Sequence, residues 1–194
     1  MLAAEGVRPA VEGDAPALAR LYNESVLPAL APPAGPPGSV AAWAQAPTTA
    51  ADWAAALRGG GEAAAGHGTG VDESLVVNQR WWVAARPGGE LAGCVAAALV
   101  PASPGGPGPS PSTPDHPTTD GAEFGALCYF WYRTGDREAG AALLAAAEAH
   151  LVALGAARCF AFVTELRPAF CYTEYLSDRA GHVHALLQAA GYER

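Results

Sequence analysis

The sequence predicts an α/β (α+β) domain in which helices flank a mixed, mostly antiparallel sheet. Two apolar runs, 80–85 and 91–100, are joined by the turn signal RPGGE, and this pattern predicts an antiparallel hairpin. A third run, 123–132, leads through a glycine-containing loop into a helix and then into a further strand. Such a crossover predicts a locally parallel or splayed strand pair. Because 194 residues suit one core, we expect a single domain over 1–194.

The N-terminal third predicts one short strand and two helices. The strand is expected at 7–11, and Asp14 then caps a helix that has Pro16 in its first turn, where a missing N–H costs nothing. Pro28 and the run APPAGPPG at 31–38 are expected to end that helix. A second helix is expected from 49 or 50 to 58, closed by three glycines.

The middle of the chain contains a low-complexity insertion. Residues 101–121 are rich in Pro, Ser and Gly and cannot pack into a core. The strand that follows should divide its side chains between two faces by alternation. One face would carry Leu127, Tyr129 and Trp131, and the other Ala126, Cys128, Phe130 and Tyr132.

The C-terminal part predicts a long helix, a strand and a final helix. The long helix carries leucines at helical spacing and ends at Gly155, where a left-handed residue is favoured. A strand is expected at 158–163 and a helix at 182–190.

Charge and cysteine content exclude several classes of protein. A formal net charge of −8 argues against nucleic acid and anionic membranes as partners. The N-terminus lacks a basic region followed by an apolar run, and no stretch reaches the roughly 18 to 20 apolar residues of a membrane span. We therefore expect a soluble, cytoplasmic protein. The four cysteines form no CxxC pair, so buried free thiols are expected and no metal site is predicted.

Three segments, taken in order, carry a family resemblance: VRPAVEGDAPALARLYNES at the start, GAALLAAAEAHLVALGAARCFAF in the long helix and next strand, and HALLQAAGYE near the end. They resemble the GNAT superfamily of acyl-CoA-dependent N-acyltransferases over nearly the whole chain. The resemblance implies acetyl-CoA as cofactor and a small or peptide amine as acetyl acceptor.

The loop before the long helix is the expected cofactor site. Backbone N–H groups at a helix N-terminus converge on one point, and the helix dipole favours negative charge there. The resemblance implies that the phosphates contact residues of this loop and of the first helical turn. The expected residues are Tyr132, Gly135, Asp136, Arg137, Glu138, Ala139, Gly140, Ala141 and Ala142.

This loop fits the family pattern in two registers. The pattern is Arg or Gln, two residues, Gly, one residue, then Gly or Ala, and Arg137, Gly140 and Ala142 satisfy it directly. Alignment through the whole helix instead makes Gly140 the second glycine and puts Glu138 at the first and Gly135 at the Arg or Gln position. A carboxylate would then stand near the phosphates, where like charges about 4 Å apart repel by roughly 1 kcal/mol in water. Such a loop should bind CoA poorly.

Amine acetylation requires a base for the ammonium proton and an acid for the departing thiolate. Glu123 lies near the place of a catalytic glutamate in the histone-acetylating branch of the family, so it is a candidate base; it also suits a solvated strand end. The family's usual acid is a tyrosine in the last helix, and the matching residue here is Leu187, which has no proton to donate. Tyr172 and Tyr175 could substitute only if their segment folds back over the site.

The chain end bears on both fold and function. Family members usually continue past the Gly-aromatic step with one or two more strands, and GYER leaves room for almost none. We therefore expect these strands to be missing and the strand 158–163 to have an uncovered edge. Two functions remain open: an active N-acetyltransferase, or a GNAT-fold protein without catalysis that serves as a structural or docking subunit with other protein subunits as partners.

Overall fold

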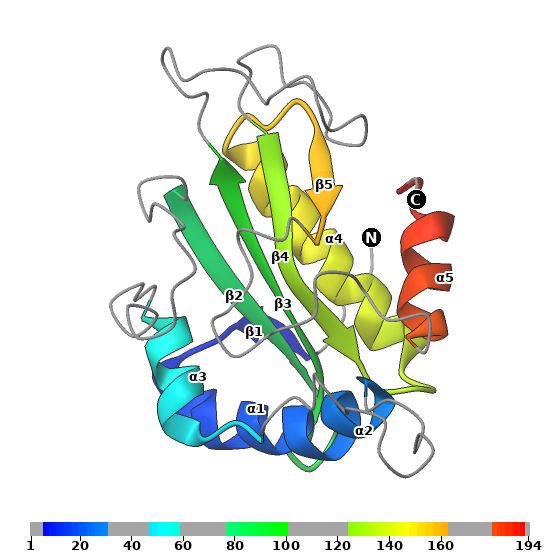
Figure 1. Cartoon of the computed structure of the whole chain (residues 1–194). Helices are drawn as coiled ribbons and strands as arrows, with labels where there is room; N and C mark the ends of the chain where they lie inside the picture. Colours follow the sequence, from blue (N-terminus) through cyan, green and yellow to red (C-terminus); the bar gives the residue numbers. More distant parts are fainter. Residues whose placement is uncertain (1–5, 31–46, 59–76, 101–123, 163–179, 193–194) are drawn as a thin grey trace, which may run out of the picture.

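The centre of the molecule is a five-stranded sheet with the order β1-β2-β3-β4-β5. The computed structural model describes residues 6–30, 47–58, 77–100, 124–162 and 180–192 (Figure 1). Neighbouring strands from β1 to β4 are antiparallel, and β5 is parallel to β4, as the sequence predicts. The strands are β1 (Val7–Pro9), β2 (Val77–Ala85), β3 (Leu91–Val100), β4 (Phe124–Tyr132) and β5 (Cys159–Ala161).

The helices match most of the predicted positions. The short 3-10 turn η1 precedes α1, and α1 continues through the π-helical turn η2 into α2. The bounds are η1 (Glu12–Asp14), α1 (Ala15–Leu21), η2 (Tyr22–Val26), α2 (Leu27–Leu30), α3 (Ala50–Leu57), α4 (Arg137–Ala153) and α5 (Gly181–Ala189).

Helices α3 and α4 cover opposite faces of the sheet. Trp81 and Trp82 are neighbours on β2, so their side chains point to opposite faces. The ring of Trp81 lies 5.5 Å from Trp53 of α3, whereas the ring of Trp82 lies 5.1 Å from His150 of α4. Figure 1 shows the resulting arrangement, with α1 to α3 gathered on one side of the sheet and α4 crossing the other beside α5.

The sequence predicts that Pro28 and the run at 31–38 end the first helix; this is wrong for Pro28, and the run lies outside the described residues. Pro28 lies inside α2, and the helical backbone continues to Leu30. A proline in a helix lacks the N–H for the usual bond to the carbonyl four residues earlier. The π-helical turn Tyr22–Val26 directly precedes α2, and such a turn changes the local hydrogen-bond spacing, which explains how the helix passes the proline.

The predicted alternation along β4 fails at a β-bulge. The register with β3 pairs Tyr129 with Ala96 and Leu127 with Ala97, so Cys128 is an extra residue on β4. Gly125 packs against Leu151 of α4, and Leu127, two residues on, shares that face. The ring of Tyr129 instead contacts Trp53 on the opposite face. Leu127 and Tyr129 therefore lie on different faces, because the inserted residue reverses the alternation.

The cysteines within the described ranges are free thiols, as predicted. Cys94 and Cys128 are buried and Cys159 is partly buried. Burial raises the pKa of the Cys128 thiol to about 12 and also raises the pKa of the Cys94 thiol. Cys171 lies outside the described residues.

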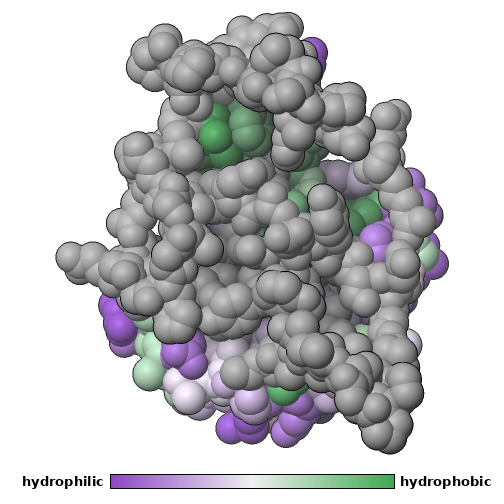
Figure 2. Space-filling view, in the orientation of Figure 1, coloured by the Kyte–Doolittle hydropathy of each residue, from purple (hydrophilic) through white to green (hydrophobic). Residues whose placement is uncertain are grey.

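Several sequence predictions fall outside the described part of the chain, namely the insertion 101–121 and the residues Glu123, Tyr172 and Tyr175. Within the described part, β5 is the last strand of the sheet. No helix there is both long and apolar enough to cross a membrane. Figure 2 shows mostly hydrophilic residues over the lower edge of this view, where α1 to α3 lie, and hydrophobic residues where β3 ends and β4 begins.

Candidate functional site

The described pairing between β4 and β5 ends halfway along β4. The parallel pairing covers three residue pairs, from Gly125 with Cys159 to Leu127 with Ala161. The last hydrogen bond between the two segments runs from Phe162 N–H to Leu127 O, at 2.8 Å. Beyond it, the described residues include no strand on the β5 side of β4. The second half of β4 therefore has one edge that is not paired with β5.

The bulge at Cys128 determines which backbone groups face this opening. Before the bulge, odd-numbered residues face β5, since Gly125 N–H donates to Arg158 O. After it, odd-numbered residues face β3, since Arg133 N–H donates to Ala92 O. Backbone direction alternates along a strand, so the amide and carbonyl of Phe130 point into the opening.

The loop between β4 and α4 is a tight turn. Asp136 N–H donates to Arg133 O at 3.0 Å, and Gly135 has a φ of +98°, which favours glycine. A Cβ at Gly135 would meet no atom within 4 Å, so the glycine serves the backbone conformation and leaves space beside it.

Asp136 is the N-cap of α4, but its carboxylate does not cap the helix. Arg86 Nε donates to Asp136 Oδ2 at 2.9 Å, and Arg86 Nη2 lies 2.7 Å from the same oxygen. These hydrogen bonds, to Asp136 first and then to Glu90, raise the pKa of Arg86. The first backbone bond of the helix is Gly140 N–H to Asp136 O, so the amides of 137–139 have no hydrogen-bond partner among the described residues.

Gly140 is required for packing inside the protein. A Cβ at this position would lie 2.6 Å from Cδ1 of the Tyr132 ring. Two contacts with His182 hold Tyr132 in place. The Tyr132 hydroxyl donates to His182 O at 2.6 Å, and the Tyr132 carbonyl oxygen lies 2.7 Å from His182 Nε2. Burial raises the pKa of the Tyr132 hydroxyl, against the opposing effect of Arg137.

The remaining predicted cofactor residues lie on the first turns of α4. Arg137, Glu138 and Ala141 are exposed, whereas Ala139 and Ala142 are partly buried. The structure thus brings the predicted loop residues together around one helix N-terminus. Glu123, the predicted base, lies outside the described residues, and Leu187 is a buried core residue of α5.

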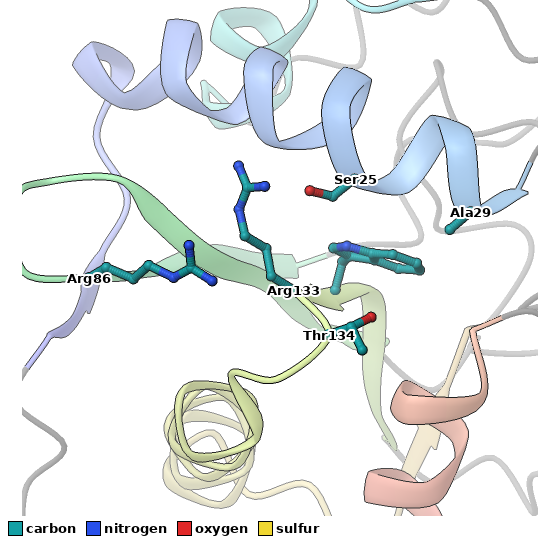
Figure 3. A pocket seen from close by; sticks show the side chains of 6 residues that line it. Ser25, Ala29, Arg86, Arg133 and Thr134 are labelled. Atoms are coloured by element: carbon teal, nitrogen blue, oxygen red, sulfur yellow. The ribbon is translucent and has the colours of Figure 1, made fainter.

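A pocket of about 320 Å³ lies beside this loop, on the side of the sheet that carries η2 and α2. Figure 3 shows Ser25 and Ala29 on the helix above it, Arg86 and Arg133 on the strand side, and Thr134 where the chain turns toward α4. The lining residues are Ser25, Ala29, Arg86, Trp131, Arg133 and Thr134.

Arg133 is the centre of an ion-pair network beside the β4–α4 loop. Its Nε donates to Leu91 O at 3.1 Å, and its Nη2 lies 3.0 Å from Glu90 and 3.4 Å from Glu24. Arg86 also pairs with Glu90, at 3.0 Å. The network joins the β2–β3 hairpin, η2 and the start of α4.

Sequence reasoning missed Arg86, Arg133 and the pocket that both residues line. The two arginines are separated by 47 positions in the chain, and neither falls in a recognisable motif. The one available signal was an Arg directly after each of two predicted strands, at Arg86 and Arg133. Within the described ranges no group of three or more His, Cys, Asp or Glu side chains could hold a metal ion.

Comparison with known proteins identifies the fold. No protein-family model matches the sequence, and no curated protein sequence matches it. Among solved structures, a protein from Arthrobacter sp. FB24 assigned as an acetyltransferase is 16% identical, with 100% of this chain and 88% of that one covered at a TM-score of 0.51. One from Agrobacterium tumefaciens str. C58, also assigned as an acetyltransferase, is 15% identical over 97% and 92% of the two chains, at 0.50.

The BH1408 protein of Bacillus halodurans, solved as a mutant, is 13% identical over 97% of this chain and 92% of that one, at a TM-score of 0.57. These likenesses extend over nearly all of both chains. The protein therefore has the fold of the GNAT-type acetyltransferases, as the sequence resemblance implied.

Proposed function

We propose that this protein transfers an acetyl group from acetyl-CoA to a primary amine. The observation that carries the proposal is the edge of β4 beyond Leu127, which has no partner strand among the described residues and lies next to the uncapped N-terminus of α4. An extended ligand with amide groups can bind an unpaired strand edge through backbone hydrogen bonds. The amide and carbonyl of Phe130 supply such an edge.

The start of α4 supports a site for the phosphates of the cofactor. The amides of 137–139 are unbonded among the described residues, and the helix dipole adds positive potential there. Arg86 holds the Asp136 carboxylate by ion pairing, which keeps that carboxylate from accepting the same amides. Arg137 adds an exposed cation to the first turn, and Glu138 adds an exposed anion that opposes phosphate binding.

Acetyl-CoA would supply a thioester whose acetyl carbon is transferred to the amine nitrogen, with CoA leaving as a thiol. Leu187 cannot protonate the departing sulfur. The cost of this absence is modest, because a thiol pKa near 8.5 lies only about 1.5 units above neutral pH, equivalent to about 2 kcal/mol. Glu123 remains our proposed base for the ammonium proton of the acceptor.

The test is calorimetric titration of the full chain with acetyl-CoA, followed by measurement of thiol release with primary amines. We expect binding in the micromolar range and amine-dependent release. The variant Arg86→Ala should bind acetyl-CoA more weakly, since Asp136 becomes free to cap the helix. The double variant Arg86→Ala/Asp136→Ala should recover the affinity. No binding by the native chain, or no recovery in the double variant, would contradict this account.

A GNAT-fold protein without catalysis is the second candidate. Two observations favour it: Leu187 is apolar and buried where the family places its proton donor, and Glu138 lies exposed in the first turn of α4. As such a protein, it would serve as a structural or docking subunit for other proteins. Absence of acetyl-CoA binding, or binding without any thiol release across a broad amine panel, would support this alternative.

A further inference from the structure

The pocket beside the β4–α4 loop is lined by hydrogen-bonding groups that are not used within the protein. The indole Nε1 of Trp131 is buried and has no hydrogen-bond partner among the described residues, and the Trp131 side chain is only 3% exposed. Burying an N–H without a partner costs about 1 to 3 kcal/mol. A buried donor in this state needs an explanation, and the pocket that Trp131 lines provides one, a ligand oxygen that accepts its hydrogen bond.

Three further groups of the lining are also unused. Nη1 of Arg133 donates no hydrogen bond to a described residue, although Nε and Nη2 of the same guanidinium do. The hydroxyls of Ser25 and Thr134 likewise have no hydrogen bond to any described residue. No carboxylate lines the pocket among the described residues, so its charged groups are arginines and its other polar groups are an N–H and two hydroxyls. This set suits a ligand group that presents oxygen acceptors.

The surrounding charges limit how negative that ligand group can be. Arg86 and Arg133 are paired with three carboxylates, those of Glu24, Glu90 and Asp136. The excess of one carboxylate repels any anionic group, and the repulsion grows in proportion to the charge of that group. A single carboxylate can still contact the 19% exposed side chain of Arg133, while Glu24 and Glu90, at 60% and 52% exposure, are well screened by water.

We propose that this pocket binds the carboxylate of a small ligand, through Arg133 Nη1, Trp131 Nε1 and the hydroxyls of Ser25 and Thr134. This assignment rests on the proposed function in one respect: the ligand is then the acetyl acceptor, an amine that also carries a carboxylate. The pocket lies on the η2–α2 side of the sheet, whereas Tyr132 and Gly140 pack on the α4 side. The volume of about 320 Å³ suits a ligand of amino-acid size.

The binding test uses the full chain without acetyl-CoA. Isothermal titration compares three matched sets of probes: glycine, leucine and phenylalanine, each with its carboxamide and its decarboxylated amine. At least one amino acid should bind at millimolar concentration or better, and at least tenfold more tightly than its decarboxylated amine. Equal binding within every set, or no binding by any carboxylate, overturns the proposal.

Variants then locate the binding. Arg133→Gln should weaken carboxylate binding about tenfold or more, and Thr134→Val should weaken it several-fold. Thr134 is exposed, so its variant stays informative if loss of the Arg133 bond to Leu91 O impairs folding. The matched control is Arg20→Gln, which removes the same charge from an exposed position on α1 and should leave affinity unchanged. Equal affinity in the native chain and both pocket variants contradicts the assignment.

A competition experiment shows whether the pocket binds the amino acid or a part of acetyl-CoA. Acetyl-CoA and the amino acid should bind together, so displacement of the amino acid by acetyl-CoA would assign the pocket to the cofactor and refute the proposal. Failure of the proposed function can be distinguished from failure of the pocket assignment. If the proposed function is wrong, the protein neither binds acetyl-CoA nor releases thiol, whatever its affinity for amino acids. Carboxylate binding that persists in that case supports the pocket and removes only its role in acetyl transfer.

Discussion

Substitution of Gly140 by alanine should destabilise the protein, although alanine is normally the better helix former. Alanine in place of glycine in a helix gains roughly 1 kcal/mol. At this position the new Cβ would lie 2.6, 2.8 and 2.8 Å from three carbons of the Tyr132 ring. Overpacking of this kind costs about 1 to 3 kcal/mol, and the Tyr132 hydroxyl bond to His182 O hinders the ring from moving. With the gain in helix propensity subtracted from the upper half of this range, we expect a net loss of about 1 to 2 kcal/mol in the free energy of unfolding.

The assay is equilibrium unfolding in urea, with equal slopes required before free energies are compared. Gly181→Ala is the matched control, because Gly181 begins α5 and a Cβ there would meet no atom within 4 Å. This control should be unchanged or more stable by up to about 1 kcal/mol. In a Tyr132→Ala background the cost of Gly140→Ala should disappear, because the ring that causes it is gone.

Gly140→Ala protein that is as stable as the native chain, or that loses the same stability in the Tyr132→Ala background, would refute a packing role for Gly140. A variant with native stability and weakened acetyl-CoA binding would show instead that this glycine serves phosphate approach. The measurement thus separates a packing role for Gly140 from a role in binding.

Glu138, Asp14 and the two buried cysteines each have a measurable effect on binding, stability or reactivity. Glu138→Gln should tighten acetyl-CoA binding about fivefold at low salt, from roughly 1 kcal/mol of relieved repulsion, and less at high salt; unchanged calorimetric affinity would contradict this. The pKa of Asp14 is lowered by the hydrogen bond from Arg8, so the pair stabilises the fold above the ordinary aspartate pKa near 3.9, and this stability is lost as pH falls through the lower folded value. Asp14→Asn should therefore cost about 1 kcal/mol at pH 7 and reduce the loss of stability in acid, measured by urea unfolding across pH. Buried Cys94 and Cys128 should resist alkylation in native protein, because their raised pKa values suppress the thiolate, and rapid native labelling by mass spectrometry would refute this.

The sequence determined the parts of the fold that depend on local patterns. The apolar spacing of 137–153 and the glycine after it identify α4, because helix periodicity and C-terminal capping involve residues a few positions apart. The hairpin of β2 and β3 and the crossover to β5 follow from the same kind of information. The candidate phosphate loop was located from sequence for this reason too.

Only the tertiary structure decided what the residues of that loop do. The bulge at Cys128 depends on the register between β4 and β3, and it reverses which side chains and amides face the opening. The packing of Gly140 on Tyr132 depends on the angle at which α4 crosses the sheet. The amides at the N-terminus of α4 stay uncapped because Arg86 binds the Asp136 carboxylate, and Arg86 lies 50 positions before Asp136 in the chain. Such contacts join distant segments, and their geometry arises only when the sheet and helices pack together.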